Sequence, residues 1–191
     1  MPCRTSARTR HRLIVSLLLP LAAWPASQAA MAADACTALT AQDAATLLGV
    51  ALPGNMKSDS PAMPENGHDH TTVCGWFPAG YDLATADGPP SRGILLTVHE
   101  MRTANDAKAF HERMAEMTRE MAQSGGAEAA VTEPAGVGTA AVMDVKKLEG
   151  AQVATVQFLD GTRAMQIQVW HAQAAPGEIA VAAAKQVAAR L

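Results

Sequence analysis

The sequence predicts an α+β domain in which an antiparallel sheet of about five strands carries three packed helices. Helical and strand patterns are grouped along the chain rather than strictly alternating, as is typical of this fold class. Two apolar segments, 152–159 and 162–171, are joined by Asp160-Gly161, a dipeptide that strongly favours a hairpin turn. A long amphipathic segment at 104–123 predicts the principal helix.

The first part of the domain is predicted to be a short helix followed by two strands. Thr40 and Asp43 have the spacing of a capping box, and Gly49 is a typical residue for the end of a helix. Strands are predicted at 73–77 and 93–100, where β-branched and apolar residues are bounded by turn-forming residues. The polar segments around these strands are predicted to be loops.

The helix at 104–123 has a candidate N-cap in Thr103, three residues before Asp106. Its apolar residues at intervals of three and four are Ala107, Phe110, Met114, Met117 and Met121. This spacing places them on one helical face, which we expect to pack in the core. An alternative for the three methionines is a copper(I) site, because thioether sulfur is a soft ligand. The helical periodicity favours the core.

Three strands and a helix are predicted for the C-terminal part, at 141–148, 152–159, 162–171 and 176–191. Pro176 suits the first turn of a helix. In the last strand, apolar and glutamine side chains alternate, with Met165, Ile167 and Val169 set against Gln166 and Gln168. This alternation predicts a sheet with one buried face and one face in contact with water.

Residues 1–33 have the three parts of a secretory signal peptide: four arginines, an apolar run at 13–24 and then small residues. The apolar run is shorter than the ~20 residues of a membrane-spanning helix. We predict cleavage between Ala30 and Ala33, with Ala33 as the last residue removed. Residues 34–191 are then a single mature domain, and the expected location is periplasmic or secreted.

The charge of the mature chain argues against nucleic acid as a partner. The full sequence has 15 basic and 18 acidic residues, and the signal peptide removes four arginines but no acidic residue. The net charge therefore changes from −3 to −7. An acidic surface repels phosphate groups, so no nucleic-acid interface is expected. No second apolar segment is long enough to cross a membrane, so no span is expected after cleavage.

Two cysteines remain after removal of the signal peptide, and in an oxidising compartment an even number predicts a disulfide. Cys36 and Cys74 are the only available pair. Their bridge closes a loop of about 39 residues, which stabilises the fold by roughly 4 kcal/mol in the chain-entropy treatment. The alternative for Cys36 is lipid attachment as in a lipoprotein, although the preceding Asp34-Ala35 is a poor lipobox.

The order and spacing of several short motifs resemble a group of uncharacterised secreted and periplasmic domains. These motifs are Cys36-x-x-Leu39-Thr40, Leu48-Gly49, Cys74-Gly-Trp76 and Pro134-Ala-Gly-Val-Gly138. The group is similar to lipoproteins with a PsbP-like α/β sandwich. The resemblance implies a binding or accessory module rather than an enzyme, and it assigns no catalytic residues.

Two motifs that suggest enzymatic chemistry lack the context that they need. The glycines at 136–141 match a dinucleotide fingerprint, but a strand pattern follows them instead of a helix, so we interpret them as a turn. His111-Glu112 begins like a zinc-protease motif, but the position of the second histidine is Ala115. We interpret His111 as a solvated helix residue. A hydrolase assembled from distant residues stays an alternative.

A candidate metal site lies in the segment 53–72, which is rich in Pro, Gly, Asn and Ser and is predicted to be a flexible loop. Its donors are His68, Asp69, His70 and Met63. Imidazole, carboxylate and thioether groups on such a loop can gather around copper or zinc. The simpler interpretation is that the two histidines are solvated.

The leading functional hypothesis is a non-enzymatic periplasmic or secreted module that binds a ligand or a protein partner. The signal peptide, the single disulfide and the lack of a catalytic motif motivate it. A copper- or zinc-binding protein that uses the His68/His70 segment is the second hypothesis, and an unrecognised hydrolase is the third.

Overall fold

The structure is a computed structural model of the full chain, and it describes residues 35–61, 67–124, 130–148, 150–172 and 175–191. Residues Ala32–Leu191 form one compact unit. The predicted signal peptide and Met63 lie outside the described residues.

The described residues form seven strands in a single sheet of order β1-β2-β3-β7-β6-β5-β4, and every neighbouring pair is antiparallel. The strands are β1 (Gly54–Ser60), β2 (His68–Phe77), β3 (Arg92–Met101), β4 (Ala130–Thr132), β5 (Ala140–Leu148), β6 (Ala151–Asp160) and β7 (Arg163–His171). Strands β5, β6 and β7 are consecutive hairpins. Strand β3 pairs with β7, which joins the N-terminal strands to this meander.

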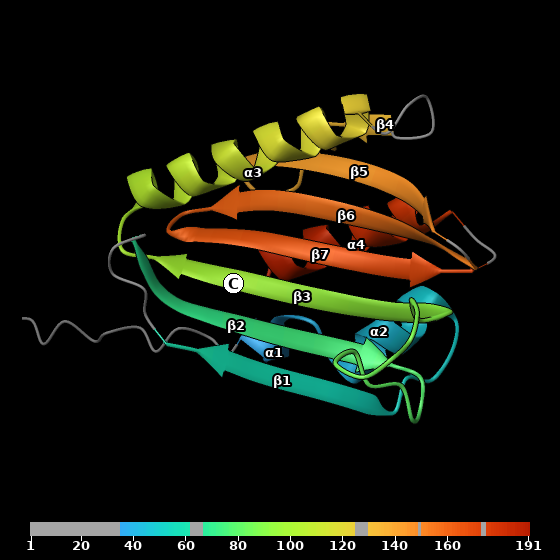
Figure 1. The fold of residues 1–191 in the computed structure, drawn as a ribbon. Coiled ribbons are helices and arrows are strands. Elements are labelled where there is room, and N and C mark those ends of the chain that lie inside the picture. The colour runs from blue at the N-terminus through green and yellow to red at the C-terminus, as the bar shows by residue number, and fades with distance from the viewer. Residues whose placement is uncertain (1–34, 62–66, 125–129, 149, 173–174) are drawn as a thin grey trace, which may run out of the picture. The chain divides into compact units, whose positions relative to one another are not determined.

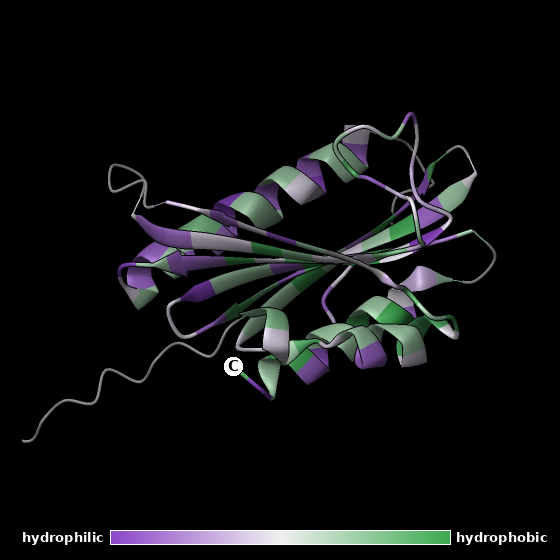
Figure 2. Ribbon diagram, turned by 90° about the horizontal axis from the view of Figure 1, so that it is seen from below, coloured by the Kyte–Doolittle hydropathy of each residue, from purple (hydrophilic) through white to green (hydrophobic). Residues whose placement is uncertain are grey.

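The helices of the described segments cover the two faces of the sheet unequally. They are α1 (Ala35–Ala38), α2 (Ala41–Leu48), α3 (Ala104–Ser124) and α4 (Pro176–Ala188). In Figure 1, α3 lies in front of the sheet and α1, α2 and α4 lie behind it. Figure 2 shows the sheet between these two layers. We call the side of α3 the α3 face and the opposite side the α4 face.

The predicted fold of about five strands and three helices is wrong, and the PsbP-like arrangement stays a prediction. The described residues contain seven strands and four helices, and the elements that the sequence did not indicate are α1, β1 and β4. Strand β1 has the sequence GNMKSDS, which shows no apolar alternation because it is an edge strand with mostly exposed residues. Strand β4 has three residues and α1 has four, too few to show a period.

The prediction that residues 53–72 form a loop is wrong over most of this range, again because an exposed edge strand shows no apolar alternation. Residues 54–60 form β1, and β2 already begins at His68. This polar segment pairs with β2 along its whole length, and Asp59 accepts a hydrogen bond of 3.0 Å from the Thr72 hydroxyl of β2.

The α4 face holds the main hydrophobic core. The strand residues exposed by at most 1% on this face are Cys74, Ile94, Leu96, Val98, Ala154, Val156, Phe158, Ile167 and Val169. They align across the sheet, as in the row Leu96, Ile167 and Val156. Helix α4 covers them with small residues, including Ala183, which is fully buried. Close approach of helix and sheet through small residues gives dense, dry packing.

The N-terminal helices are attached to the α4 face by covalent and polar links. A disulfide joins Cys36 to Cys74, which is 1% exposed in the core, with a Cα–Cα distance of 5.5 Å. The predicted capping box of α2 is present, because Thr40 and Asp43 exchange hydrogen bonds. Arg190 donates to Oδ2 of Asp43 at 2.6 Å and thereby connects the C-terminal end of the chain to α2.

The glycine-rich segment before β5 is a turn, as the sequence indicated. Gly136 and Gly138 have positive φ values of 74° and 52°. A side chain at Gly138 would collide with the carbonyl oxygen of Leu159. That oxygen accepts a hydrogen bond of 2.8 Å from the backbone N–H of Thr139. The glycines therefore allow the chain to pass close to β6.

Candidate functional site

The α3 face of the sheet carries polar side chains where the α4 face carries the core. Thr97, Gln166 and Gln157 occupy neighbouring positions on β3, β7 and β6. Gln168 and Thr155 are neighbours in the next row. We call these five residues the polar band. Gln157 and Thr155 are 6% and 7% exposed, and the other three are half-buried. Amide and hydroxyl groups therefore lie in the middle of the sheet.

One carboxylate continues the second row of the polar band on β5. Asp144 lies opposite Thr155, and its side chain is 3% exposed. The ammonium group of Lys146 is 3.1 Å from Oδ2 of Asp144. The contact is an ion pair, although Oδ2 accepts no hydrogen bond. The lysine therefore balances the charge of this carboxylate.

Helix α3 packs on this face through small and polar residues, and the predicted methionine face is wrong. Its buried residues are Ala107, His111, Ala115, Thr118 and Ala122. Met117 and Met121 are 47% and 48% exposed. The buried stripe is displaced by about one residue from the predicted one, and it has the same helical period. Because the sheet beneath α3 is polar, apolar periodicity did not identify the packed face.

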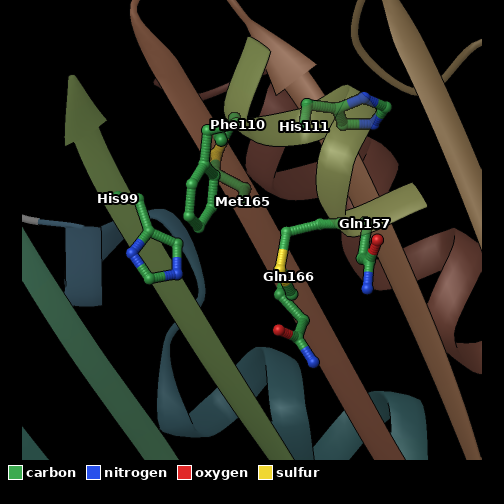
Figure 3. A pocket seen from close by; sticks show the side chains of 8 residues that line it. His99, Phe110, His111, Gln157, Met165 and Gln166 are labelled. Carbon is green, nitrogen blue, oxygen red and sulfur yellow. The ribbon is translucent and has the colours of Figure 1, made fainter. Parts of the chain in front are cut away.

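A small pocket lies between α3 and the sheet (Figure 3). Its lining residues are His99, Phe110, His111, Met114, Gln157, Ala164, Met165 and Gln166. Its volume of about 10 Å³ is comparable to the space that a single water molecule requires. The described residues that line it supply imidazole and amide groups but no serine, cysteine or lysine.

Several polar atoms around this pocket are buried without a hydrogen-bond partner. The Gln157 amide donates to Oγ1 of Thr118 at 3.0 Å, but its Oε1 accepts no hydrogen bond. Nε2 of His111 and Nδ1 of His68 also lack partners among the described residues. The side chains of Gln157, His111 and His68 belong to residues that are each 6% exposed. An unpaired buried polar atom costs about 1–3 kcal/mol, so these three atoms lower the contribution of this face to the stability of the fold.

A cluster of aromatic rings fills the end of the α3 face next to the pocket. The ring centroid of His68 is 5.3 Å from that of His99 and 4.8 Å from that of Phe110, in both cases edge to face. The His99 and Phe110 rings, from β3 and α3, are 4.8 Å apart and lie side by side in Figure 3. The hydroxyl of Thr71 lies 3.2 Å from Nδ1 of His99. His68 is therefore a packed residue and not a solvated one.

Burial favours the neutral form of two of these histidines. Burial, together with the neighbouring His68, lowers the pKa of His99 to about 4. Burial also lowers the pKa of His111, and this effect is partly opposed by a hydrogen bond with the Gln157 backbone and by Glu112. The prediction that His111 is solvated is therefore wrong. Both imidazoles are neutral at pH 7, so they can donate and accept hydrogen bonds.

The residues predicted to bind metal are separated in the structure. His68 lies under α3, whereas Nε2 of His70 is 3.2 Å from Asp59 at the exposed edge of the sheet. A bulge between His68 and His70 interrupts the pairing of β2 with β3 at this point. Asp69 is 4.0 Å from Arg102. The fourth candidate, a methionine, lies outside the described residues. Copper or zinc binding by this set stays a prediction.

Within the described ranges, no group of three or more His, Cys, Asp or Glu side chains is arranged to hold a metal ion. None of the described helices combines the length and apolar character that a membrane crossing requires.

The polar band and the buried histidines were only partly recognisable in the sequence. The alternation of Gln166 and Gln168 in the last strand predicted a face in contact with water. That face is polar, but α3 covers part of it and both glutamines are half-buried. The same alternation is present in β6, where Thr155 and Gln157 are separated by a buried valine. No local pattern indicated that Thr118 of α3 lies against this strand, because its contact with Gln157 spans 39 positions.

The described residues form a sheet-rich fold, a single seven-stranded antiparallel sheet with one apolar and one more polar face. The sequence matches no protein-family model. No curated protein is significantly similar to it. The fold is similar to the extracellular domain of PknH from Mycobacterium tuberculosis, with a TM-score of 0.55 and 12% sequence identity. The match covers 81% of this chain and 92% of that domain. At this identity the similarity concerns the fold alone.

Proposed function

We propose that the protein is a non-enzymatic binding module that works outside the cytoplasm and holds a small, neutral, polar ligand on its α3 face. The signal-peptide pattern of residues 1–33 and the Cys36–Cys74 disulfide support the location. The fold similarity to an extracellular domain is consistent with it.

The observation that carries the proposal is the cluster of buried, unpaired polar atoms on the α3 face. Gln157 Oε1 and His111 Nε2 have no partner among the described residues, although aliphatic residues at these positions would pack as on the α4 face. Polar groups that reduce stability are often retained for binding or catalysis. The space beside these atoms, about 10 Å³, accommodates one water molecule, which would recover the cost of their burial. A larger ligand contacts the half-buried glutamines of the polar band instead.

The chemistry of the polar band indicates the class of ligand. Its five side chains are two threonines and three glutamines, which donate and accept hydrogen bonds but carry no charge. The neighbouring carboxylate of Asp144 is balanced by Lys146. Hydroxyl- and amide-bearing compounds, such as sugars and peptides, match these groups. The half-buried Gln166 and Gln168 are the accessible members that make the first contacts.

The test is a binding assay with defined neutral probes. The secreted, processed protein is titrated with monosaccharides, N-acetylated amino sugars and capped dipeptides, and binding is followed by ligand-observed NMR. At least one probe class is expected to bind. In the variant Gln166→Leu/Gln168→Leu, binding is expected to weaken by about tenfold or more, because two hydrogen-bonding groups are lost.

The matched control is Gln42→Leu/Gln123→Leu, which removes two glutamines away from the polar band. This control is expected to bind like the parent protein. Binding that survives in the Gln166/Gln168 variant, or that is lost equally in the control, contradicts the proposed site. Failure of every neutral probe contradicts the proposed ligand class.

A further inference from the structure

The exposed surface of α3 carries two methionines that are not part of its packed stripe. Met117 and Met121 are 47% and 48% exposed, and both lie outside the set of buried residues of the helix. Large apolar side chains at such positions stabilise a folded domain little. The thioether groups of both residues are therefore within reach of solvent and of solutes.

The geometry of the helix brings the two sulfur atoms close together. Residues four positions apart on a helix have Cβ atoms about 5–6 Å apart. Long side chains in helices point back towards the N-terminus, so the side chain of Met121 extends over the turn that carries Met117. Methionine has three rotatable side-chain bonds and can adjust its sulfur position at little cost. Two thioethers can thus approach one ion from the same side.

We infer that Met117 and Met121 form a binding site for a soft monovalent metal ion, copper(I) or its analogue silver(I). Thioether sulfur prefers soft ions and has little affinity for the harder ions that carboxylates and water bind. Met114 is half-buried and lines the pocket beneath α3, so it is not part of the exposed pair.

The charges around the methionine pair favour a cation. Glu116 and Glu120 are exposed neighbours of the two methionines in the same two turns of α3. Arg113 lies one turn before the pair, and the guanidinium of Arg119 is engaged by Glu133 at 2.9 Å. Arg113 offsets one of the two glutamates because it lies four positions before Met117, so the net charge beside the pair is about −1.

This site differs from the segment that the sequence singled out. His68 is packed against Phe110 under α3, and His70 lies beside Asp59. The methionine pair is presented on a regular helix, whose backbone hydrogen bonds hold the two residues at a constant spacing. The inference is independent of the neutral ligand proposed above, which binds under and beside α3 through amide and hydroxyl groups.

The test is an anaerobic titration of the processed protein with copper(I) in competition with bicinchoninate. The parent protein is expected to withdraw one equivalent of copper(I) from the chromophore. In Met117→Leu/Met121→Leu, the affinity is expected to fall by about tenfold or more, because leucine nearly keeps the side-chain volume but has no donor atom. Circular dichroism verifies that the helix content is unchanged.

A variant of two other methionines tests whether copper(I) binding is specific to Met117 and Met121. Met143→Leu/Met165→Leu replaces two methionines that pack in the main core, and it is expected to bind copper(I) like the parent. Unchanged affinity in Met117→Leu/Met121→Leu overturns the inference. Equal weakening in the Met143/Met165 variant also overturns it, because the binding is then unspecific.

A histidine control separates this site from the predicted metal segment. His68→Ala/His70→Ala is expected to bind copper(I) like the parent protein. A loss of affinity confined to this variant overturns the inference, because it assigns the copper(I) to the histidines instead of the methionines.

A second measurement identifies the donors directly. The methyl signals of methionine are recorded by NMR while silver(I) is added to protein labelled at the methionine methyl carbons. The signals of Met117 and Met121 are expected to shift together within the first equivalent. If other methionines shift first, the assignment to α3 is wrong.

Discussion

The two faces of the sheet are built from the same strands, yet their interiors differ in chemistry. On the α4 face, adjacent strands contribute Leu96, Ile167 and Val156, and all three side chains are fully buried. On the α3 face, the corresponding row contains the polar-band residues of β3, β7 and β6. The α4 face is packed with apolar side chains. The α3 face contains buried polar atoms that have no hydrogen-bond partner among the described residues.

This difference shows which face supplies most of the apolar burial, and the other face is where we place the proposed binding function. Burial of apolar area is the dominant favourable contribution to folding, and it is concentrated on the α4 face together with the disulfide. The α3 face contributes less to stability and offers hydrogen-bonding groups instead. Substitutions on the α4 face should therefore lower the free energy of unfolding strongly, and substitutions on the α3 face should lower it little.

Removal of the disulfide is expected to have the largest effect on stability. In Cys36→Ala/Cys74→Ala, the free energy of unfolding should fall by roughly 4 kcal/mol, because the loop of about 39 residues becomes free in the unfolded chain. Urea unfolding followed by the fluorescence of tryptophan, including the buried Trp76, measures this change. The parent protein under reducing conditions should behave similarly. A loss below about 1 kcal/mol would show that the α4 face does not depend on this link.

Adjacent residues of β7 provide a direct comparison of the two faces. Ile167→Ala should reduce the free energy of unfolding by about 3 kcal/mol, because it leaves a cavity in a fully buried position. Gln166→Ala, one residue away on the α3 face, should change it by less than about 0.5 kcal/mol. Urea midpoints of the two variants measure the difference. Similar losses in both would disprove the division between the faces.

Acidic pH should weaken the attachment of α3. The pKa of His99 is about 4 in the folded protein and about 6.5 in the unfolded chain. The unfolded chain therefore binds more protons between these values, so stability is complete above pH 6.5 and is lost as the pH falls to 4. After allowance for partial exposure to solvent, we expect a loss of about 2 kcal/mol.

Chemical unfolding at several pH values measures this effect, and His99→Gln serves as the control because glutamine does not titrate. The variant should show a flatter pH profile than the parent between pH 6.5 and 4. Identical profiles would mean that His99 does not control the pH dependence.

The smallest effect is expected for an apolar replacement within the polar pair beneath α3. Thr118→Val/Gln157→Leu removes both partners of a 3.0 Å hydrogen bond and the unpaired Oε1 of Gln157. Its stability should be unchanged or higher by up to about 1 kcal/mol. Gln157→Leu alone leaves Thr118 buried without its partner and should cost about 1 kcal/mol. Thermal unfolding of the three proteins measures the difference, and a large loss in the double variant would show that the polar pair is structural.

Local patterns in the sequence predicted those elements whose conformation is determined locally. Strand β3, the β6–β7 hairpin and the start of α4 lie where their apolar runs, Asp160-Gly161 and Pro176 indicated. The capping box at Thr40 and the bridge between Cys36 and Cys74 are also present. Each of these features depends on neighbouring residues or, for the bridge, on a count that leaves a single pairing.

The candidate site could not be derived in this way. His68 was predicted to be solvated, and it is buried because β2 extends to this residue and α3 places Phe110 against its ring. The exposed Met117 and Met121 were predicted to be core residues because the helical period does not tell which stripe meets the sheet. The orientation of α3 depends on contacts with strands far away in sequence.

By itself, the sequence determined the antiparallel hairpins, the caps of α2, the disulfide pair and the presence of one apolar and one more polar face. These properties follow from the two-residue period of strands and from turn chemistry, which act over a few residues. Only the tertiary structure decided that polar segments form β1, that α3 turns His111 and Thr118 inward, and that two of its methionines face solvent. The pairing of an edge strand and the rotation of a helix about its own axis depend on contacts with residues far away in the sequence. No local sequence pattern encodes these contacts.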